Sequence, residues 1–251
     1  MIEWRDEGVV LSVRKHGETS VLLEVFTQTR GRCTGILRGG VSRKMAPHIQ
    51  PGAQVALVWK ARLEDHLGHF SVEPLRSRAQ VLEDPLALAA LTSMTALLTQ
   101  LLPEREAHSY LYVDTQKVLD RLGRDAHWPL SYLNWETALL EEMGYGLDLS
   151  RCAVTGSRDD LAFVSPRTGR AVSRRGAGDW ADKLLPLPQC LLGQAPLDYI
   201  DIARGLKTTG HFIARLAGEL GDKPMPAARD RFLDRITRKG SGPSGEEAGG
   251  F

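Results

Sequence analysis

Cysteine is scarce in this sequence, and the three cysteines that it has lie far apart. They are Cys33, Cys152 and Cys190, and no Cys-x-x-Cys pair occurs. Closely spaced cysteines are typical of structural zinc sites and of disulfide frameworks, so we expect neither here. Each cysteine is expected to be a small buried hydrophobic residue, and no metal or other cofactor is predicted.

The motifs of common enzyme classes are also missing. The sequence has no G-x-x-x-x-G-K-[ST], no H-E-x-x-H, no G-x-S-x-G and no G-x-G-x-x-G that opens a helix. His66 and His69 form a close pair in a predicted turn, and Asp159 lies next to Asp160, but neither pair has an evident third metal ligand. We therefore expect a binding protein without catalytic residues.

Signals for secretion and for membrane insertion are not visible either. The chain does not start with a basic segment followed by an apolar run and a small-residue cleavage site, so a cytoplasmic location is expected. The uncharged segment from Pro85 to Pro103 contains Thr95 and Gln100 and has a proline at each end. A helix packed in a bundle is a better interpretation of this segment than a membrane span.

Acidic residues are absent from one stretch of the N-terminal region. No Asp or Glu lies between Glu24 and Glu64, although the whole chain has 32 Lys and Arg against 31 Asp and Glu. Such a local positive field attracts a polyanion, because each Lys or Arg that meets a phosphate releases a condensed counterion. A solvated face without a ligand is the alternative, but ordinary surfaces intersperse both signs. The residues predicted to contact DNA are Arg14, Lys15, Arg30, Arg32, Arg38, Arg43, Lys44, Lys60 and Arg62.

Residues 1–80 have the pattern of a small β-barrel. Apolar and β-branched runs over 21–26 and 33–37 flank a turn with Gly31 and predict a hairpin, and further strands are predicted over 9–14, 52–60 and 68–73. Five short strands in this length indicate a closed barrel of the oligonucleotide-binding (OB) type, which binds single strands. Aromatic residues for base stacking are few, and Trp59 and Phe70 favour the core. Residues 38–47 contain paired glycines and Pro47, which predict a mobile basic loop without regular structure.

Helical periodicity replaces the strand pattern after Asp84. Helices are predicted over 85–102, 104–122, 129–143, 198–220 and 227–238, with an irregular insert over 148–195. The Gly-, Ser- and Glu-rich residues 239–251 are expected to be a disordered tail. The predicted fold is α+β, with an OB-type barrel over 1–80 and a helical domain over 81–238 that the insert interrupts.

Several short motifs resemble those of the RecO family of bacterial DNA repair and recombination proteins. They are Gly17-Glu18-Thr19-Ser20, Leu23-Glu24-Val25-Phe26-Thr27, Gly31-Arg32, Arg38-Gly39-Gly40, Gln50-Pro51-Gly52, Ala61-Arg62-Leu63, Tyr132-Leu133 and Glu136 to Gly144. The resemblance implies a non-enzymatic recombination mediator that binds single- and double-stranded DNA and anneals complementary strands. It further implies RecR as a partner, and in some members RecF, in loading RecA onto strands coated by the single-stranded-DNA-binding protein.

The family resemblance also bears on the insert and on the helical domain. Many members have a zinc-ribbon-like insert with two Cys-x-x-Cys pairs, whereas this chain has Cys152-Ala153-Val154-Thr155 and no cysteine over 172–175. A degenerate, metal-free insert packed around Phe163 and Trp180 is therefore expected. By analogy, Arg121 and Arg124 are assigned to a binding site for the tail of the single-stranded-DNA-binding protein. An RNA-binding OB protein that acts on structured RNA, and a purely structural adaptor, remain alternatives.

Overall fold

The computed structural model describes residues 1–221 and 224–241, and it has an α+β fold. The chain divides into two compact units, one with residues 1–128 and 217–229, the other with residues 129–216 and from 230 onward. The first unit therefore contains α1 (Pro85–Leu101) and α2 (Ser109–Arg121) together with the N-terminal strands. This grouping differs from the expected boundary near residue 80, because contacts described below tie these two helices to the strands.

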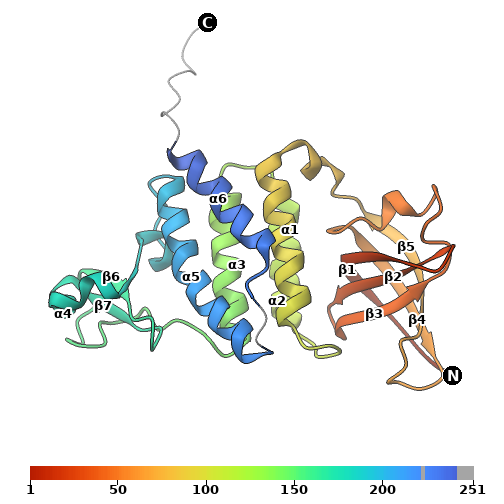
Figure 1. The fold of residues 1–251 in the computed structure, drawn as a ribbon, viewed down its shortest axis with the longest axis horizontal. Helices are drawn as coiled ribbons and strands as arrows, with labels where there is room; N and C mark the ends of the chain where they lie inside the picture. The colour runs from red at the N-terminus through yellow and green to blue at the C-terminus, as the bar shows by residue number, and fades with distance from the viewer. Residues whose placement is uncertain (222–223, 242–251) are drawn as a thin grey trace, which may run out of the picture. The chain divides into compact units, whose positions relative to one another are not determined.

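The first unit begins with five strands that close into a barrel in the order β1-β2-β3-β5-β4 (Figure 1). The strands are β1 (Ile2–His16), β2 (Ser20–Thr27), β3 (Gly31–Leu37), β4 (Gln54–Ala61) and β5 (His69–Arg76). Neighbouring strands are antiparallel except at one short seam, where β3 and β5 pair in parallel through Ile36 with His69 and Leu37 with Phe70. The number and order of the strands fit the OB-type barrel expected from the sequence.

β1 is longer than the strand predicted over 9–14. Residues 2–9 pair with β4 and residues 8–16 pair with β2, with a register shift between Val10 and Ser12. One bent strand therefore pairs with two different neighbours, β4 through its first half and β2 through its second, as bulged strands do. The first half was missed because Glu3, Arg5 and Glu7 are exposed charged residues, which depress the apolar signal of a strand.

The barrel interior is filled by the apolar side chains that alternate along the strands. Val10, Leu23, Val25 and Leu57 are buried there, and so are Trp59 and Phe70, as predicted. Trp4 of β1 stacks on Trp59 with ring centroids 5.6 Å apart.

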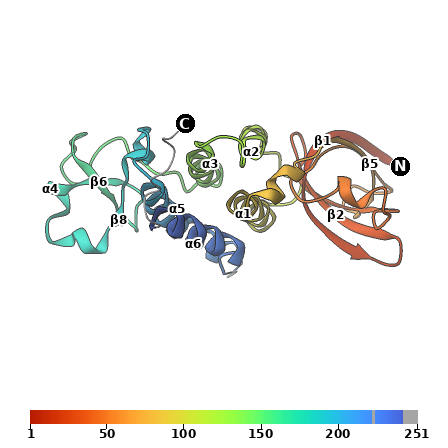
Figure 2. The same cartoon turned by 90° about the horizontal axis from the view of Figure 1, so that it is seen from above.

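The helices agree with the predicted periodicity except at a few ends. They are α1, α2, α3 (Trp128–Glu142), α4 (Arg174–Ala177), α5 (Tyr199–Glu219) and α6 (Ala227–Ser241), with short 3-10 helices η1 (Ala46–His48), η2 (Ala79–Glu83), η3 (Gly178–Lys183) and η4 (Gln189–Leu192). Figure 2 looks along α1 and α2, which lie side by side.

The prediction of a tail from residue 239 was wrong for 239–241, which belong to α6; residues 242–251 lie outside the described residues. No helix in the described ranges is long and apolar enough to cross a membrane.

α2 begins at Ser109 and not at residue 104. Just before it, Glu104 forms a parallel bridge with Arg32 of β3, and the amide of Arg105 donates to the carbonyl of Arg32 at 2.8 Å. Arg105 has a φ of 62°, which a right-handed helix does not allow. We refer to residues 102–109, which follow α1 and contact the barrel, as the bracing segment.

Residues 38–47 are more regular than predicted. The amide of Ser42 donates to the carbonyl of Gly39, and the amides of Met45 and Ala46 both donate to the carbonyl of Ser42. η1 follows directly and contains Pro47 at a position where the missing N–H costs nothing. The loop is thus a series of hydrogen-bonded turns.

The insert contains a three-stranded sheet of β6 (Leu161–Val164), β7 (Ala171–Ser173) and β8 (Leu185–Pro186). The expectation that Trp180 packs inside it was wrong, because this side chain is 65% exposed and lies against Lys183. Phe163 is half-buried, and the buried residues of the insert include Cys152, Leu161, Val164, Ala171 and Val172.

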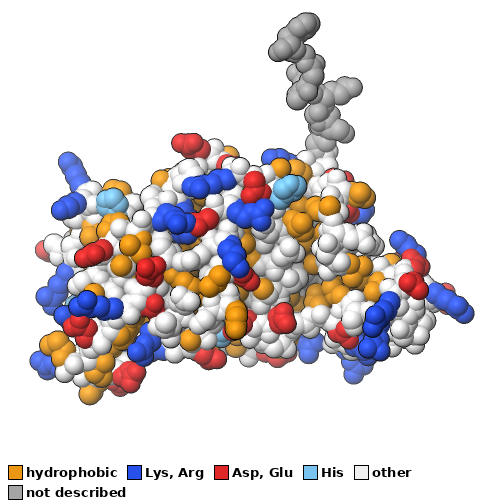
Figure 3. All heavy atoms as spheres, turned by 180° about the vertical axis from the view of Figure 1, so that it is seen from behind, with side chains coloured by type: hydrophobic (Ala, Val, Ile, Leu, Met, Phe, Trp, Pro, Cys, Tyr) orange, Lys and Arg blue, Asp and Glu red, His pale blue; other side chains and the backbone are white. Residues whose placement is uncertain are grey.

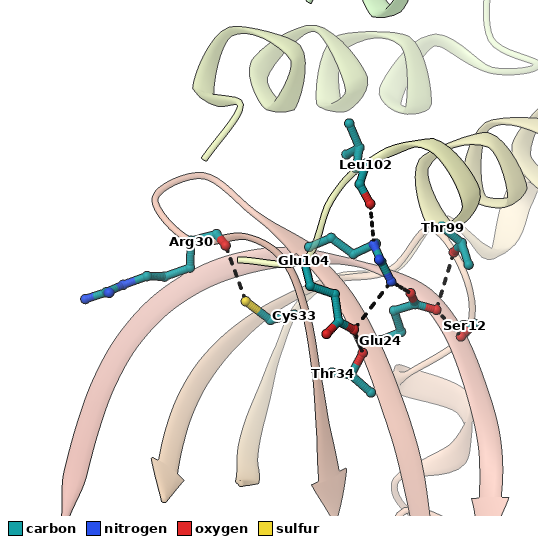
Figure 4. Close-up of polar contacts among 9 residues, drawn as sticks. Ser12, Glu24, Arg30, Cys33, Thr34, Thr99, Leu102 and Glu104 are labelled. Carbon is teal, nitrogen blue, oxygen red and sulfur yellow. Dashed lines mark hydrogen bonds and ion pairs between the residues drawn. The ribbon is translucent and has the colours of Figure 1, made fainter. Parts of the chain in front are cut away.

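A buried ion pair within the β2–β3 hairpin is hydrogen-bonded to the bracing segment (Figure 4). Arg32 Nη1 lies 2.7 Å from Glu24 Oε1, with side chains that are only 17% and 5% exposed. Arg32 Nε donates to the carbonyl of Leu102 at 2.8 Å, and Glu24 also accepts bonds from the hydroxyls of Ser12 and Thr99. Because removing one member of a buried pair leaves an uncompensated charge, this pair constrains the hairpin strongly.

A second buried cation attaches the end of β5 to α2. Arg78 donates to Asp120 Oδ1 and to the carbonyl of Gly52, at 2.8 and 2.6 Å. Burial raises the pKa of the Asp120 carboxyl, but bonds from Arg76 and the charge of Arg78 outweigh burial and hold this pKa below its usual value. Gln54 of β4 further donates to the Tyr112 hydroxyl of α2 at 2.7 Å.

The close contact at Gly31 generates a test of the bracing segment. Gly31 has a φ of 64°, and a Cβ built on it would lie 1.7 Å from the carbonyl oxygen of Glu106. We expect Gly31→Ala to lower the free energy of unfolding by about 3 kcal/mol or more, because strain and overpacking add. Gly39→Ala is the control: Gly39 has a similar φ of 72° but no atom within 4 Å of that Cβ, so about 1 kcal/mol is expected. Equal losses in urea unfolding would show that the bracing segment does not press on the hairpin.

The buried ion pair generates a double-mutant cycle. We expect Arg32→Met to lower the free energy of unfolding by about 3 kcal/mol, because Glu24 is then left buried and charged without a cation. Adding Glu24→Gln removes that charge, so the double variant should be more stable than Arg32→Met alone. Additive losses in denaturant titrations would contradict a coupled pair.

Candidate nucleic-acid interface

A groove of about 910 Å³ lies over the seam between β3 and β5. Its floor is apolar and includes Ile36, Leu37 and Phe70, and its rim carries cations and histidines. The residues of the rim are Arg38, Lys60, Arg62, His66 and His69. The groove forms here because β3 and β5 pair over only two residues, and the loops that follow β3 and β4 extend beyond the sheet.

Five of the nine predicted DNA contacts gather at this groove. Arg38, Lys60 and Arg62 line it directly. Arg43 and Lys44 are exposed on the 38–47 loop, whose Met45 also lines the groove.

Arg14 and Lys15 lie two strands away from the groove. Lys15 pairs with Val21 of β2, and Val21 pairs with Leu37, which lines the groove. Since neighbouring strands are about 5 Å apart, the backbone of Lys15 is about 10 Å from that of Leu37. A long lysine or arginine side chain can extend a phosphate track over this distance.

Arg30 and Arg32 lie at the other end of the β2–β3 hairpin, away from the groove. Arg30 is exposed in the turn and places its guanidinium over Trp4, 5.9 Å from the ring centroid. Arg32 is held by Glu24 and by Glu104, which is 3.5 Å away. We therefore leave Arg32 out of the proposed interface, because its charge is already neutralised within the protein.

The cations around the groove differ in how far protein carboxylates neutralise them. Lys60 Nζ lies 2.8 Å from Glu3, its partner across the strands. In the part of the chain that the structure describes, no carboxylate lies within ion-pair distance of Arg38, Arg43, Lys44 or Arg62. These four exposed charges are the ones most available to an anion.

Arg105 of the bracing segment fixes one wall of the groove, and the sequence did not point to it. Its guanidinium donates to the carbonyls of Glu64 and His66, the latter at 2.8 Å, and lies 5.7 Å from the centroid of the Trp59 ring. The β4–β5 loop, residues 62–68, thereby keeps His66 and Leu67 at the groove. A positive φ at a non-glycine residue is a structural signal with no reliable counterpart in sequence.

Arg121 and Arg124, which were assigned to a protein partner, lie at the end of α2 and after it. Arg121 forms a two-point ion pair with Asp125, with Nε 2.8 Å from Oδ2. That bond raises the pKa of Arg121 and lowers the pKa of Asp125. Arg124 is exposed, so of the two it has the more accessible charge.

Figure 3 shows how charge is distributed on one face of the molecule, where Lys and Arg side chains are interspersed with Asp and Glu. Mixed charge of this kind is ordinary for a protein surface. Among the described residues, no group of three or more His, Cys, Asp or Glu could hold a metal ion.

Comparisons with known proteins agree with this architecture. The family model for the N-terminal part of recombination protein O matches residues 1–78, and the model for its C-terminal part matches residues 82–223. A "DNA repair protein RecO" of Cereibacter sphaeroides (strain KD131) is 58% identical over 239 residues, which cover 95% of this chain and 100% of that protein. Proteins of the same name from Roseobacter denitrificans and Dinoroseobacter shibae are 57% and 58% identical over 240 residues, covering 95% of this chain and 100% and 99% of theirs. The chain therefore belongs to the RecO family, and its role lies in DNA repair and recombination.

Proposed function

We propose that this protein is a non-enzymatic recombination mediator that binds single- and double-stranded DNA across the groove of its barrel. The observation that carries the proposal is the set of four exposed cations without carboxylate partners, Arg38, Arg43, Lys44 and Arg62, beside an apolar floor. Lys60 extends this set, and Arg14 and Lys15 prolong it toward the β1–β2 turn. Arg30 forms a separate contact at the opposite end of the hairpin.

The geometry favours contacts to phosphates over readout of bases. The 38–47 loop presents its charges on hydrogen-bonded turns, and Phe70 is buried in the floor with little surface for stacking. Phosphate contacts carry no sequence information and make binding strongly dependent on salt. DNA binding should therefore be sensitive to ionic strength and tolerant of sequence.

Strand annealing follows from the same surface without a chemical step. Two complementary strands repel each other through their phosphates, and cations that neutralise both strands on one surface lower that repulsion. In this proposal the protein anneals complementary strands and, with RecR and RecF, helps RecA load onto strands coated by the single-stranded-DNA-binding protein. In this proposal the partners are those that the family resemblance implies, and the protein acts in the cytoplasm, at the nucleoid.

The four free cations generate the main test of DNA binding. We expect Arg38→Glu/Arg43→Glu/Lys44→Glu to weaken binding of a labelled single strand by at least tenfold at moderate salt. The plot of log affinity against log salt has a negative slope. The magnitude of this slope should decrease by about 2, because about three counterion-releasing contacts are lost. Fluorescence anisotropy over a salt series measures both quantities, and annealing of complementary oligonucleotides should fall in parallel.

A matched control separates this effect from a change in overall charge. Arg5→Glu/Lys117→Glu/Lys207→Glu changes the net charge equally at exposed positions outside the groove and should leave the salt slope near that of the unmodified protein. Equal losses in both triple variants would remove the groove from the interface. Competition between matched DNA and RNA strands tests the alternative, since a strong preference for RNA would favour the RNA-binding function.

A second contact is proposed for the tail of the single-stranded-DNA-binding protein, with Arg124 at its cationic rim. An acidic, apolar tail peptide should bind the full-length chain, and Arg124→Glu should weaken that binding several-fold because a cation then becomes an anion. The control is Lys117→Glu, which makes the same change of charge on α2, the helix that precedes Arg124. Calorimetry that detects no heat of binding for the peptide, or equal weakening by both variants, would refute this site.

A further inference from the structure

The zinc site that the family resemblance implies does not fit the side chains of the insert. Two pairs of residues, each with two residues between its members, occupy the relevant turns: Cys152 with Thr155, and Ser173 with Gly176. They offer one thiol, two hydroxyls and no fourth side chain, whereas structural zinc takes four Cys or His ligands. The Thr155 hydroxyl lies 3.4 Å from the amide of Ser157, which can donate to it.

All four positions nevertheless converge on one atom, the sulfur of Cys152. The amide and the hydroxyl of Ser173 donate to this sulfur at 3.2 and 3.3 Å, and the amide of Thr155 donates to it at 3.4 Å. A Cβ built on Gly176 would lie 2.8 Å from the same sulfur. In a tetrahedral metal site, two turns face each other and each supplies a pair of ligands to the metal between them.

We infer that the insert is a metal-free form of a two-turn metal fold, in which the Cys152 sulfur takes the place of the metal and accepts the hydrogen bonds that fix both turns. Cys152 is 1% exposed, so water cannot replace these bonds. The Ser173 hydroxyl extends the network by accepting from the Gly176 amide at 3.1 Å. The amide of Ala153 donates to the carbonyl of Ala171, which joins the first turn to β7.

The environment of the sulfur agrees with this role as an acceptor. Burial raises the pKa of the Cys152 thiol, but the bonds donated by Ser173 and Thr155 outweigh burial and lower the pKa to about 6. The other two cysteines behave differently: burial raises the pKa of Cys33 and of Cys190 to about 11. Cys152 is the cysteine whose sulfur accepts several hydrogen bonds from the chain around it.

The role of the sulfur is tested by comparing Cys152→Ala with Cys190→Ala in the full-length protein. Both cysteines are buried, but the Cys190 thiol donates to the carbonyl of Asp201 at a long 3.7 Å, whereas the Cys152 sulfur accepts bonds from Ser173 and Thr155. We expect Cys152→Ala to speed amide hydrogen exchange over residues 152–176 by about tenfold, because three donors lose their acceptor. Cys190→Ala should leave that segment unchanged. Unchanged exchange in Cys152→Ala would overturn the inference.

The metal-free state is tested by metal content and by rebuilding the site. Untagged protein from zinc-supplemented cells should contain far less than one zinc per chain, and a chelator should not shift its melting temperature. Thr155→Cys/Ser173→Cys/Gly176→Cys should bind about one Zn²⁺ per chain, melt at a higher temperature with zinc, and give a tetrahedral thiolate spectrum with Co²⁺.

A control moves the three new cysteines to nearby positions, by two residues in the first turn and by one residue in the second. Ala153→Cys/Val172→Cys/Arg175→Cys adds the same number of thiols at positions that do not converge on the sulfur, and it should give neither the tetrahedral Co²⁺ spectrum nor the rise in melting temperature. One tightly held zinc in the unmodified protein would overturn the inference. So would a rebuilt triple variant that takes up no metal, or a control that takes it up equally well.

Discussion

The buried pair of Arg32 and Glu24 is the interaction on which the geometry of the barrel surface depends. Arg32 also donates to the carbonyl of Leu102, and its own carbonyl accepts from Arg105. Through these bonds the β2–β3 hairpin fixes the bracing segment, and Arg105 of that segment holds the carbonyls of Glu64 and His66 in the β4–β5 loop. An ion pair at one end of the barrel therefore helps to place one wall of the groove at the other. Its cost in desolvation is offset only because hydroxyls and a carbonyl satisfy the remaining lone pairs and protons.

Much of the fold could be predicted from the sequence because its periodic segments are long and regular. The hairpin over residues 20–37, α1 and α3 follow from alternation and from helical spacing. The errors lie where tertiary contacts override local preference. Residues 2–8 form a strand despite their charge because β4 pairs with them, and Glu104 and Arg105 lie outside α2 because Arg32 of β3 binds them. Trp180 is exposed although its size favoured burial, and it lies against Lys183.

The candidate interface could be predicted only in part, because an acid-free stretch of sequence says nothing about acids that other segments bring. Glu104 reaches Arg32 from beyond α1, and Glu3 reaches Lys60 from the first strand. The field was correctly located on the barrel, but not every cation in it is free. The contribution of Arg105 had no signal in the sequence, because it depends on a positive φ and on two backbone carbonyls of another loop.

Strand register decides which of these cations are free. Lys60 stands opposite Glu3, and Arg32 lies diagonally across from Glu24, so both meet a carboxylate within the sheet. Lys15 stands opposite Val21, which offers it no charge. Arg38 and Arg62 lie just beyond the ends of β3 and β4, outside the ladders of the barrel. Whether a carboxylate across the sheet neutralises a barrel cation therefore depends on its ladder partners, and the register supplies this information where composition cannot.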